Sequence, residues 1–282
     1  MIRAIEYASF ASEVFVLPAA VTKIQVMLND ERATMDDFAN VVKIDPTLAS
    51  QLLKIVNSPI YNFRDPVDSV MRAVRILGTK AIYDLAISYG VACAFNDYNK
   101  NTIDLERFWE YSVRTALFSQ YWAQRLALHE PERFFTAGLI HNIGELVVVR
   151  RHPKTAVQCT RFMINEQPWE KQQSVMGYTY KDITIKLLQV WGLPSSIIDL
   201  IKPMHESPHH IGSIDSKVVQ LAYHQSLLES YPSLINDICE LPEHYAISLG
   251  LNQSSLDKSV DNIRHRLLTV VSLFTTYGYG IN

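Results

Sequence analysis

Cysteine and glycine are both scarce in this chain of 282 residues, which contains 3 cysteines and 10 glycines. Cys93, Cys159 and Cys239 lie far apart and form no CxxC or CxxH spacing, which argues against a disulfide framework and a zinc knuckle. The chain also lacks short alternating runs separated by Asn-Gly or Asp-Gly turns, the usual signature of strands. We therefore expect an all-α protein of the reducing cytoplasm.

Long hydrophobic runs and a surplus of one charge are absent as well. No run of about 18 apolar residues occurs, and the longest apolar stretch, 81–95, contains Asp84 and predicts a buried helix. The first residues show no basic start followed by an apolar segment, so we expect neither a signal peptide nor a membrane partner. A net charge of -3 leaves no basic surplus to neutralise phosphates, which argues against nucleic acid as the main partner. The sequence also lacks the GxSxG nucleophile elbow and the GxxxxGK and GxGxxG phosphate loops.

Helical periodicity is present along much of the chain. Within 105–128, apolar residues recur mostly every three, four or five positions, which predicts an amphipathic helix of several turns. Asp45 followed by Pro46 predicts a helix start, with the carboxylate as N-cap and proline at the first helical position. Asn57 is expected to close the same helix by hydrogen-bonding its free carbonyls.

Two other aspartates are expected to cap helices. Asp36 is the predicted N-cap of one helix, and Asp68 is the predicted N-cap of another that ends at Gly78. Helix stops are also predicted at the sequence Trp-Gly-Leu-Pro in 191–194.

The softest boundary in the chain is the polar turn 96–101. It divides a predicted N-terminal helical lobe, 1–98, from a larger lobe, 99–282, that carries a C-terminal helical extension. The apolar and aromatic segment 267–279 predicts the last core helix, or a docking or homodimer surface where part of it is exposed.

Eight short segments, taken in order, carry a family resemblance. They are Leu17-Pro18, 44–48, 52–58, 67–78, Phe108-Trp109 with Ser112, 135–144, Leu187-Leu188 and 191–194. The sequence resembles the HDOD (HD-related output domain) family over roughly residues 14–225. That resemblance implies a two-lobed helical fold whose second lobe is similar to the HD-type metal-dependent phosphohydrolases.

In those enzymes, a histidine, a His-Asp doublet and a later aspartate hold a divalent metal that activates a water molecule. The flanking motifs place these ligands at Tyr111, at the doublet His141-Asn142 and at Tyr223. Two further histidine positions of the HD enzymes fall on Tyr180 and His205, which would lie in a pocket.

The residues found at these positions predict a degenerate site without catalytic residues, metal or other cofactor. A divalent cation in a partly buried site needs anionic oxygens, and an amide or a phenol of pKa about 10 does not supply them at neutral pH. His141 is expected to be a core histidine that hydrogen-bonds a helix carbonyl or Asn142. Gly144 is expected to let the next segment pack closely.

Histidine is concentrated in 204–210, the best rival metal site in the sequence. His205, His209 and His210 would be its weak alternative ligands, but Pro208 interrupts the helix that would align them. A surface loop is therefore expected there. The other histidines, which are expected to be exposed to solvent, are His129, His152, His224, His244 and His265.

The sequence as a whole favours a regulatory or output module of bacterial signal transduction without chemistry of its own. Such a module binds a signalling protein or a small ligand through a helical surface or pocket. The alternative is a metal-dependent phosphohydrolase acting on a nucleotide or cyclic dinucleotide, with His141 and a neighbouring carboxylate such as Glu145 as substitute ligands.

Overall fold

A computed structural model describes residues 4–28, 30–95, 103–161, 163, 166–206, 213–231 and 240–275. All regular elements in these ranges are helices, which confirms the predicted all-α class. The chain forms two compact units. The smaller unit comprises Val16–Tyr98 with His265–Asn282, and the larger unit comprises Met1–Phe15 with Asn99–Arg264. The predicted lobes, 1–98 and 99–282, differ from these units in the assignment of both termini. The predicted boundary turn 96–101 lies outside the described residues.

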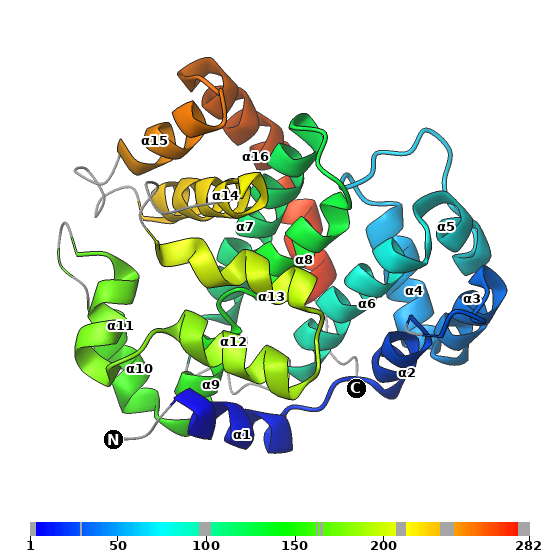
Figure 1. Cartoon of the computed structure of the whole chain (residues 1–282), viewed down its shortest axis with the longest axis horizontal. Helices are drawn as coiled ribbons and strands as arrows, with labels where there is room; N and C mark the ends of the chain where they lie inside the picture. The colour runs from blue at the N-terminus through cyan, green and yellow to red at the C-terminus, as the bar shows by residue number, and fades with distance from the viewer. Residues whose placement is uncertain are drawn as a thin grey trace. The chain divides into compact units, whose positions relative to one another are not determined.

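The smaller unit is built mainly from five helices (Figure 1). They are α2 (Ala19–Met27), α3 (Met35–Ile44), α4 (Pro46–Val56), α5 (Val70–Leu77) and α6 (Thr79–Ala94). The second half of α16 (Gln253–Thr275) completes the unit. Helix α6 contains all but the last residue of the longest apolar stretch, 81–95, which is largely buried as predicted, including Asp84 at 2% exposure.

Two predicted caps of the smaller unit are confirmed at α4. The Asp45 carboxylate accepts hydrogen bonds from the backbone amides of Thr47 and Leu48, each at 3.0 Å. At the other end, the Asn57 amide donates to Leu53 O at 2.9 Å and to Val67 O at 2.8 Å. Asn57 therefore closes α4 and also holds the following loop against it.

Two other predicted caps are wrong by one or two positions. Thr34 caps α3 in place of Asp36, because its side chain and that of Asp37 satisfy each other's backbone amides in a capping box. Ser69 caps α5 in place of Asp68, with its hydroxyl accepting from Arg72 N at 3.3 Å. Helix α5 ends before Gly78 as predicted, and Gly78 has a φ of 86°.

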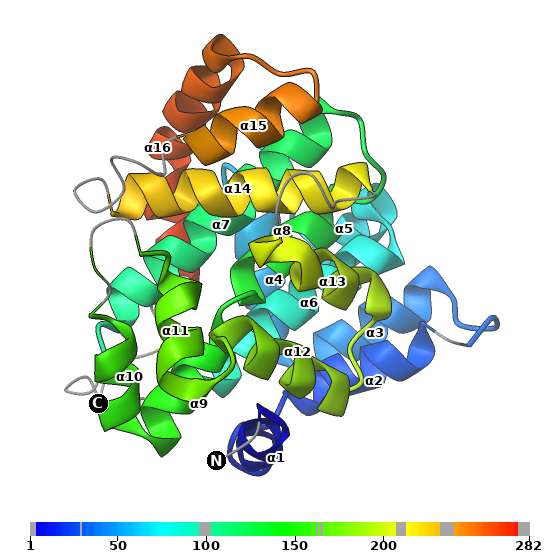
Figure 2. The same cartoon turned by 60° about the vertical axis from the view of Figure 1, so that its left-hand side comes forward.

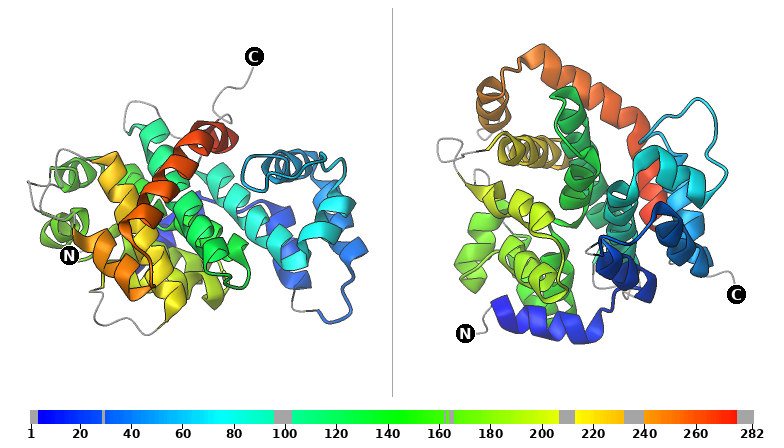
Figure 3. Two further views of the ribbon diagram at one scale, coloured as in Figure 1. Left: turned by 90° about the horizontal axis from the view of Figure 1, so that it is seen from above. Right: turned by 45° about the vertical axis from the view of Figure 1, so that its right-hand side comes forward.

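The larger unit has α7, α8 and α14 packed together (Figures 1 and 2). Its helices are α1 (Ala4–Val14), α7 (Leu105–Arg125), α8 (Pro131–Ile140), α9 (Ile143–Arg151), α10 (Pro153–Cys159), α11 (Pro168–Met176), α12 (Tyr180–Val190), α13 (Ser195–Ile201), the 3₁₀ helix η1 (Lys202–His205), α14 (Ile214–Ser230) and α15 (Glu240–Ser248). The start of α16 also belongs here. Helix α1 lies along α12 and also contacts α9 (Figure 3), which accounts for its place in this unit.

Close packing of α9 against α12 depends on Gly144. A Cβ atom at this position would overlap the carbonyl oxygen of Tyr180, and the Gly144 amide donates to Thr184 Oγ1 at 2.9 Å. The expected role of Gly144 is therefore confirmed. It fixes the start of α9 beside the start of α12.

Within the described residues, no single helix is long and apolar enough to cross a membrane. Helices α1 and α2, taken together as a broken pair, satisfy this criterion by length and composition only.

Candidate functional site: a tyrosine-lined cavity beside His141

His141 and Asn142 form the short connection between α8 and α9. The His141 side chain is buried, and its Nδ1 lies 2.7 Å from the carbonyl oxygen of Gly138 in the last turns of α8. Because a carbonyl only accepts, Nδ1 is the nitrogen that carries the proton. Burial lowers the pKa of His141 to about 4, so the imidazole is neutral at physiological pH. His141 is the core histidine bonded to a helix carbonyl that the sequence predicts.

Two aromatic rings from different helices surround the other side of this imidazole. Tyr111 of α7 lies with its ring centroid 5.4 Å from that of His141, and Tyr223 of α14 lies at 5.5 Å, both edge to face. The His141 Nε2 atom is buried and has no hydrogen-bond partner among the described residues. Tyr111, His141 and Tyr223, far apart in the sequence, are therefore brought together.

The two phenols remain protonated at neutral pH. Burial raises the pKa of Tyr111 and of Tyr223 above the usual tyrosine range, and the two hydroxyls interact with each other. A protonated phenol is a poor metal ligand. Among the described residues, no group of three or more His, Cys, Asp or Glu side chains is arranged to hold a metal ion.

Glu145, in the first turn of α9, is the carboxylate closest in sequence to the doublet. Its Oε2 accepts a hydrogen bond of 2.6 Å from Asn142 Nδ2. Burial raises the pKa of Glu145 to about 7, and the Asn142 bond and the positive charge of Arg107 limit that rise. Asn142 thus directs its amide group to a carboxylate.

A cavity of about 50 Å³ opens beside these groups. Its lining residues come from α7, α9, α10, α11, α12 and α14 and their flanks: Tyr111, Asn142, Glu145, Cys159, Thr160, Pro168, Gln172, Tyr180, Tyr223, Leu227 and Tyr231. Tyr180, one of the two residues expected in a pocket, is therefore in this wall. Its hydroxyl is buried and has no hydrogen-bond partner among the described residues beyond the neighbouring Cys159 thiol.

His205, the other expected pocket residue, lines a different depression. It stacks on Trp169 with 4.7 Å between ring centroids and 12° between planes, and these two side chains border a hollow of about 510 Å³ with Lys181 and Asp182. Burial and the nearby Lys181 charge lower the pKa of His205. His209 and His210 lie outside the described residues.

The expectation that the remaining histidines are exposed is wrong for His224. This residue is 3% exposed, stacks on Tyr245 with ring centroids 5.0 Å apart, and has a pKa lowered by burial to about 3. It lies on the buried side of α14, next to Tyr223. His152 is half-buried and bonded to the Tyr7 hydroxyl at 2.9 Å, whereas His129, His244 and His265 are exposed as expected.

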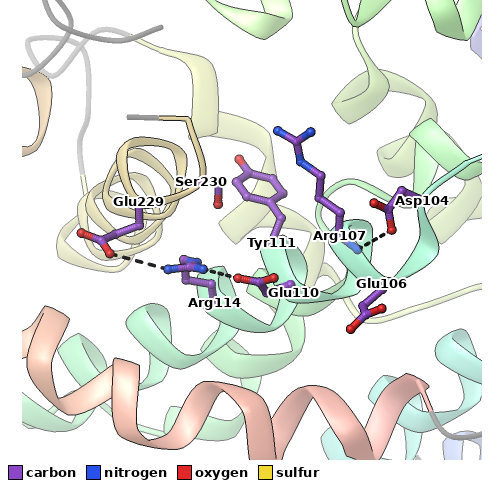
Figure 4. Close-up of a pocket in the computed structure, with 8 residues that line it drawn as sticks. All are labelled: Asp104, Glu106, Arg107, Glu110, Tyr111, Arg114, Glu229 and Ser230. Carbon is purple, nitrogen blue, oxygen red and sulfur yellow. Dashed lines mark hydrogen bonds and ion pairs between the residues drawn. The ribbon is translucent and has the colours of Figure 1, made fainter. Parts of the chain in front are cut away.

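Tyr111 also lines a polar groove of about 370 Å³, together with residues from the start of α7 and the end of α14 (Figure 4). Arg114 lies between Glu110 and Glu229 and pairs with both, with Glu229 at 3.6 Å. Arg107 lies in the first turn of α7, and its guanidinium carbon is 4.7 Å from the centroid of the Tyr231 ring. Four carboxylates and two arginines line the groove, so it carries a net negative charge even with these ion pairs.

Sequence reasoning missed Arg107 and Tyr231 as members of this site. Arg107 stands four residues before Tyr111, and residues four apart share a helix face, so this spacing is a signal for Arg107. Tyr231 follows the last residue of α14 and has non-helical torsions, so helical spacing does not identify it.

Comparison with known proteins places this chain in a family. Residues 14–207 match the HDOD domain, and the chain belongs to the HDOD domain family. The resemblance inferred from the sequence is thereby confirmed.

Several solved structures share the fold over nearly the whole chain. A proposed phosphohydrolase from Shewanella amazonensis has a TM-score of 0.73 and 21% identity, covering 95% of this chain and 97% of that one. An HDOD domain protein of unknown function from Geobacter sulfurreducens has a TM-score of 0.68 and 18% identity, covering 96% and 98%. A proposed signal transduction protein from Marinobacter aquaeolei has a TM-score of 0.64 and 20% identity, covering 93% of this chain and 60% of that one.

One curated relative, an uncharacterized protein of Treponema pallidum, is 24% identical over 200 residues. The match covers 68% of this chain but only 38% of the relative's length. At identities of 18% to 24%, these relatives show the fold of the chain but do not establish its activity.

Proposed function

We propose that this chain is a non-catalytic regulatory module of bacterial signal transduction, which binds a protein partner or a small ligand through its larger unit. The module binds its partner or ligand without catalysing a reaction, and the side chains around His141 form one wall of the binding site. The proposal places the module in the cytoplasm, in keeping with its dispersed cysteines.

The observation that carries the proposal is the packing of Tyr111 and Tyr223 against His141. The HD-type enzymes place metal ligands at these positions, whereas here two protonated phenols fill the space next to the imidazole. Only one of the four expected ligands, His141, is of the right chemical type. A metal held by one imidazole and neutral oxygens would not recover the cost of its desolvation.

The dimensions of the cavity support binding of a small group over hydrolysis of a nucleotide. Pockets that bind small molecules usually enclose about 300 to 1,000 Å³. The cavity beside His141 has about 50 Å³, enough for a few atoms of a ligand. A nucleotide phosphate and its metal would need a larger opening at this place.

Metal analysis and hydrolysis assays test the proposal. Purified protein, analysed by mass spectrometry for bound metals, is expected to contain no stoichiometric manganese, iron, zinc or magnesium. Assays with these ions and with nucleotides or cyclic dinucleotides are expected to show no turnover above that of the His141→Ala variant.

The rival function, a phosphohydrolase that uses His141 and Glu145 as substitute ligands, gives the opposite result. Tightly bound metal in a one-to-one ratio, together with turnover that disappears in His141→Ala, would refute the regulatory proposal. A thermal melt of this variant shows whether a loss of turnover reflects a loss of folding.

A further inference from the structure

The carboxylate of Glu145 has an unusual environment for a charged group. It points from α9 toward the cavity, and its one hydrogen bond to a described residue comes from the neutral amide of Asn142. No ion pair joins Glu145 to a described basic residue. A partly buried carboxylate with so little compensation raises the free energy of the folded protein.

Tyrosine side chains supply most of the remaining polar lining of the cavity. Tyr111, Tyr180, Tyr223 and Tyr231 all border it, and the charge of Glu145 acts on all four phenols. Phenol oxygens accept hydrogen bonds, and aromatic faces attract cations through their quadrupole. The cavity is therefore electrostatically suited to a cation and unsuited to an anion such as phosphate.

A cation already lies on one wall of this site. The guanidinium of Arg107 is 4.7 Å from the centroid of the Tyr231 ring, and Arg107 is not among the residues that line the cavity. Arg107 lowers the pKa of Glu145 without forming an ion pair with it. This contact shows the cation–π attraction of the wall, and it leaves the interior of the cavity available to a second positive group.

We propose that the cavity beside His141 binds the ammonium group of an alkylamine, held by the Glu145 carboxylate and the surrounding tyrosines. A volume of about 50 Å³ fits a primary ammonium and its first carbon atoms and does not fit a nucleotide. This inference rests on the proposed regulatory function and names the chemistry of its ligand.

Two sources supply such an ammonium group: a free small amine, and the side chain of a lysine on a partner protein. Both present a primary ammonium at the end of an alkyl chain, which is the shared chemistry. A lysine side chain reaches several ångströms beyond its backbone, so a partner would insert it past an exposed lining residue such as Thr160.

Calorimetric titration of the full chain with n-butylammonium chloride, at tens of millimolar, measures this binding. Tetramethylammonium chloride at equal ionic strength is the reference for bulk salt effects. Glu145→Gln removes the charge while keeping an oxygen for Asn142, and it is expected to weaken butylammonium binding about tenfold or more. Glu243→Gln changes the net charge equally at an exposed position of α15 and is expected to leave binding unchanged.

The pH dependence provides a second readout. The groups that face Glu145 are Arg107 and Tyr111 of α7, Asn142 before α9, Cys159 of α10, Tyr180 of α12, Tyr223 of α14 and Tyr231 after it. The pKa of the Cys159 thiol and of each of these phenols is raised, so Glu145 is the group that gains charge between about pH 6 and pH 8. Butylammonium binding is expected to tighten roughly tenfold over that interval, since the amine itself stays charged.

A pair of peptides identifies the source of the ligand. If the protein binds both butylammonium and the peptide acetyl-Gly-Lys-Gly-amide, and if Nε-acetylation of the lysine abolishes binding of the peptide, the site is assigned to a protein side chain. Butylammonium binding without peptide binding assigns it to a free amine. The inference is overturned if butylammonium does not bind, or if it binds equally to the wild type and Glu145→Gln. The metal and hydrolysis assays stand apart from these outcomes and test the regulatory function alone.

Discussion

The ring of Tyr111 meets the imidazole of His141 edge to face, with 5.4 Å between the two centroids. This contact joins α7 to the end of α8, between two positions at which the family resemblance predicts metal ligands of the HD-type enzymes. Burial at this contact favours the neutral imidazole over the charged one, because desolvation penalises the charged form. Tyr111, His141 and Tyr223 are therefore part of the packed interior of the larger unit.

Burial of neutral histidines gives the protein a defined sensitivity to acid. The folded pKa of His224 is about 3, against about 6.5 in an unfolded chain. Below pH 6.5 the unfolded chain takes up a proton that folded His224 does not, so this residue makes the free energy of unfolding fall as the pH falls. Above about pH 6.5 its contribution is constant.

Replacing His224 with Phe should remove this contribution, since the ring stacking on Tyr245 is kept and no proton is bound. The difference in free energy of unfolding between variant and wild type should shift by about 2 kcal/mol, in favour of the variant, between about pH 7.5 and pH 5. Urea denaturation at the two pH values measures it. The exposed His129→Phe should show no such shift, and equal behaviour of the two variants would contradict the burial of His224.

Gly144→Ala should strongly destabilise the larger unit. The added methyl group would overlap the carbonyl oxygen of Tyr180, a backbone atom that moves only if α12 moves. We expect a loss of about 3 kcal/mol in free energy of unfolding, measured by urea denaturation. Gly250→Ala is the control, because its φ of 71° carries a conformational cost of about 1 kcal/mol while no atom lies within 4 Å of the added carbon. Equal losses in the two variants would refute the close approach of α9 and α12.

The capping box of α3 can be tested against the aspartate that follows it. Thr34→Ala should cost about 1 to 2 kcal/mol in free energy of unfolding, because it leaves the Asp37 amide without its acceptor. Asp36→Ala should cost about 0.5 kcal/mol, since that carboxylate only interacts with the helix dipole. A larger loss for Asp36→Ala would restore Asp36 as the cap.

Local sequence patterns predict the caps of α4 correctly but not the N-caps of α3 and α5. Asp45 precedes a proline that favours the first helical position, so it is predicted correctly as the N-cap of α4. Asn57 directly follows the last residue of α4, and its role at the end of that helix is also predicted correctly. At α3 and α5, polar residues one or two positions apart compete for the cap position. The hydroxyl residue wins each time because the helix begins one residue after it, a choice that depends on backbone torsions rather than on residue type.

The site shows a different limit. The family pattern identifies His141, and its hydrogen bond to a helix carbonyl follows from its place at the end of α8. His224 has no such pattern, and its burial follows from the way α14 packs on α7 and α15, which no local sequence feature specifies. The joining of Glu145 to four tyrosines from three helices and a helix flank is likewise a tertiary result.

Glu145→Gln should stabilise the folded protein at neutral and alkaline pH. The folded pKa of Glu145 is about 7, against about 4.5 when unfolded, so the unfolded chain releases the proton first as the pH rises. The wild type therefore loses free energy of unfolding between about pH 4.5 and pH 7, and the loss is complete above pH 7.

Glutamine does not ionise, so the free energy of unfolding of the variant should exceed that of the wild type by up to about 3 kcal/mol at pH 8 and by little at pH 5. Urea denaturation without added amine measures this difference. Glu243→Gln, at an exposed position, should show no pH-dependent gain. A variant that is less stable than the wild type at pH 8 would mean that the carboxylate is compensated within the protein. A gain in stability coupled to the loss of butylammonium binding would instead show that the charge is kept at a cost to stability because a ligand requires it.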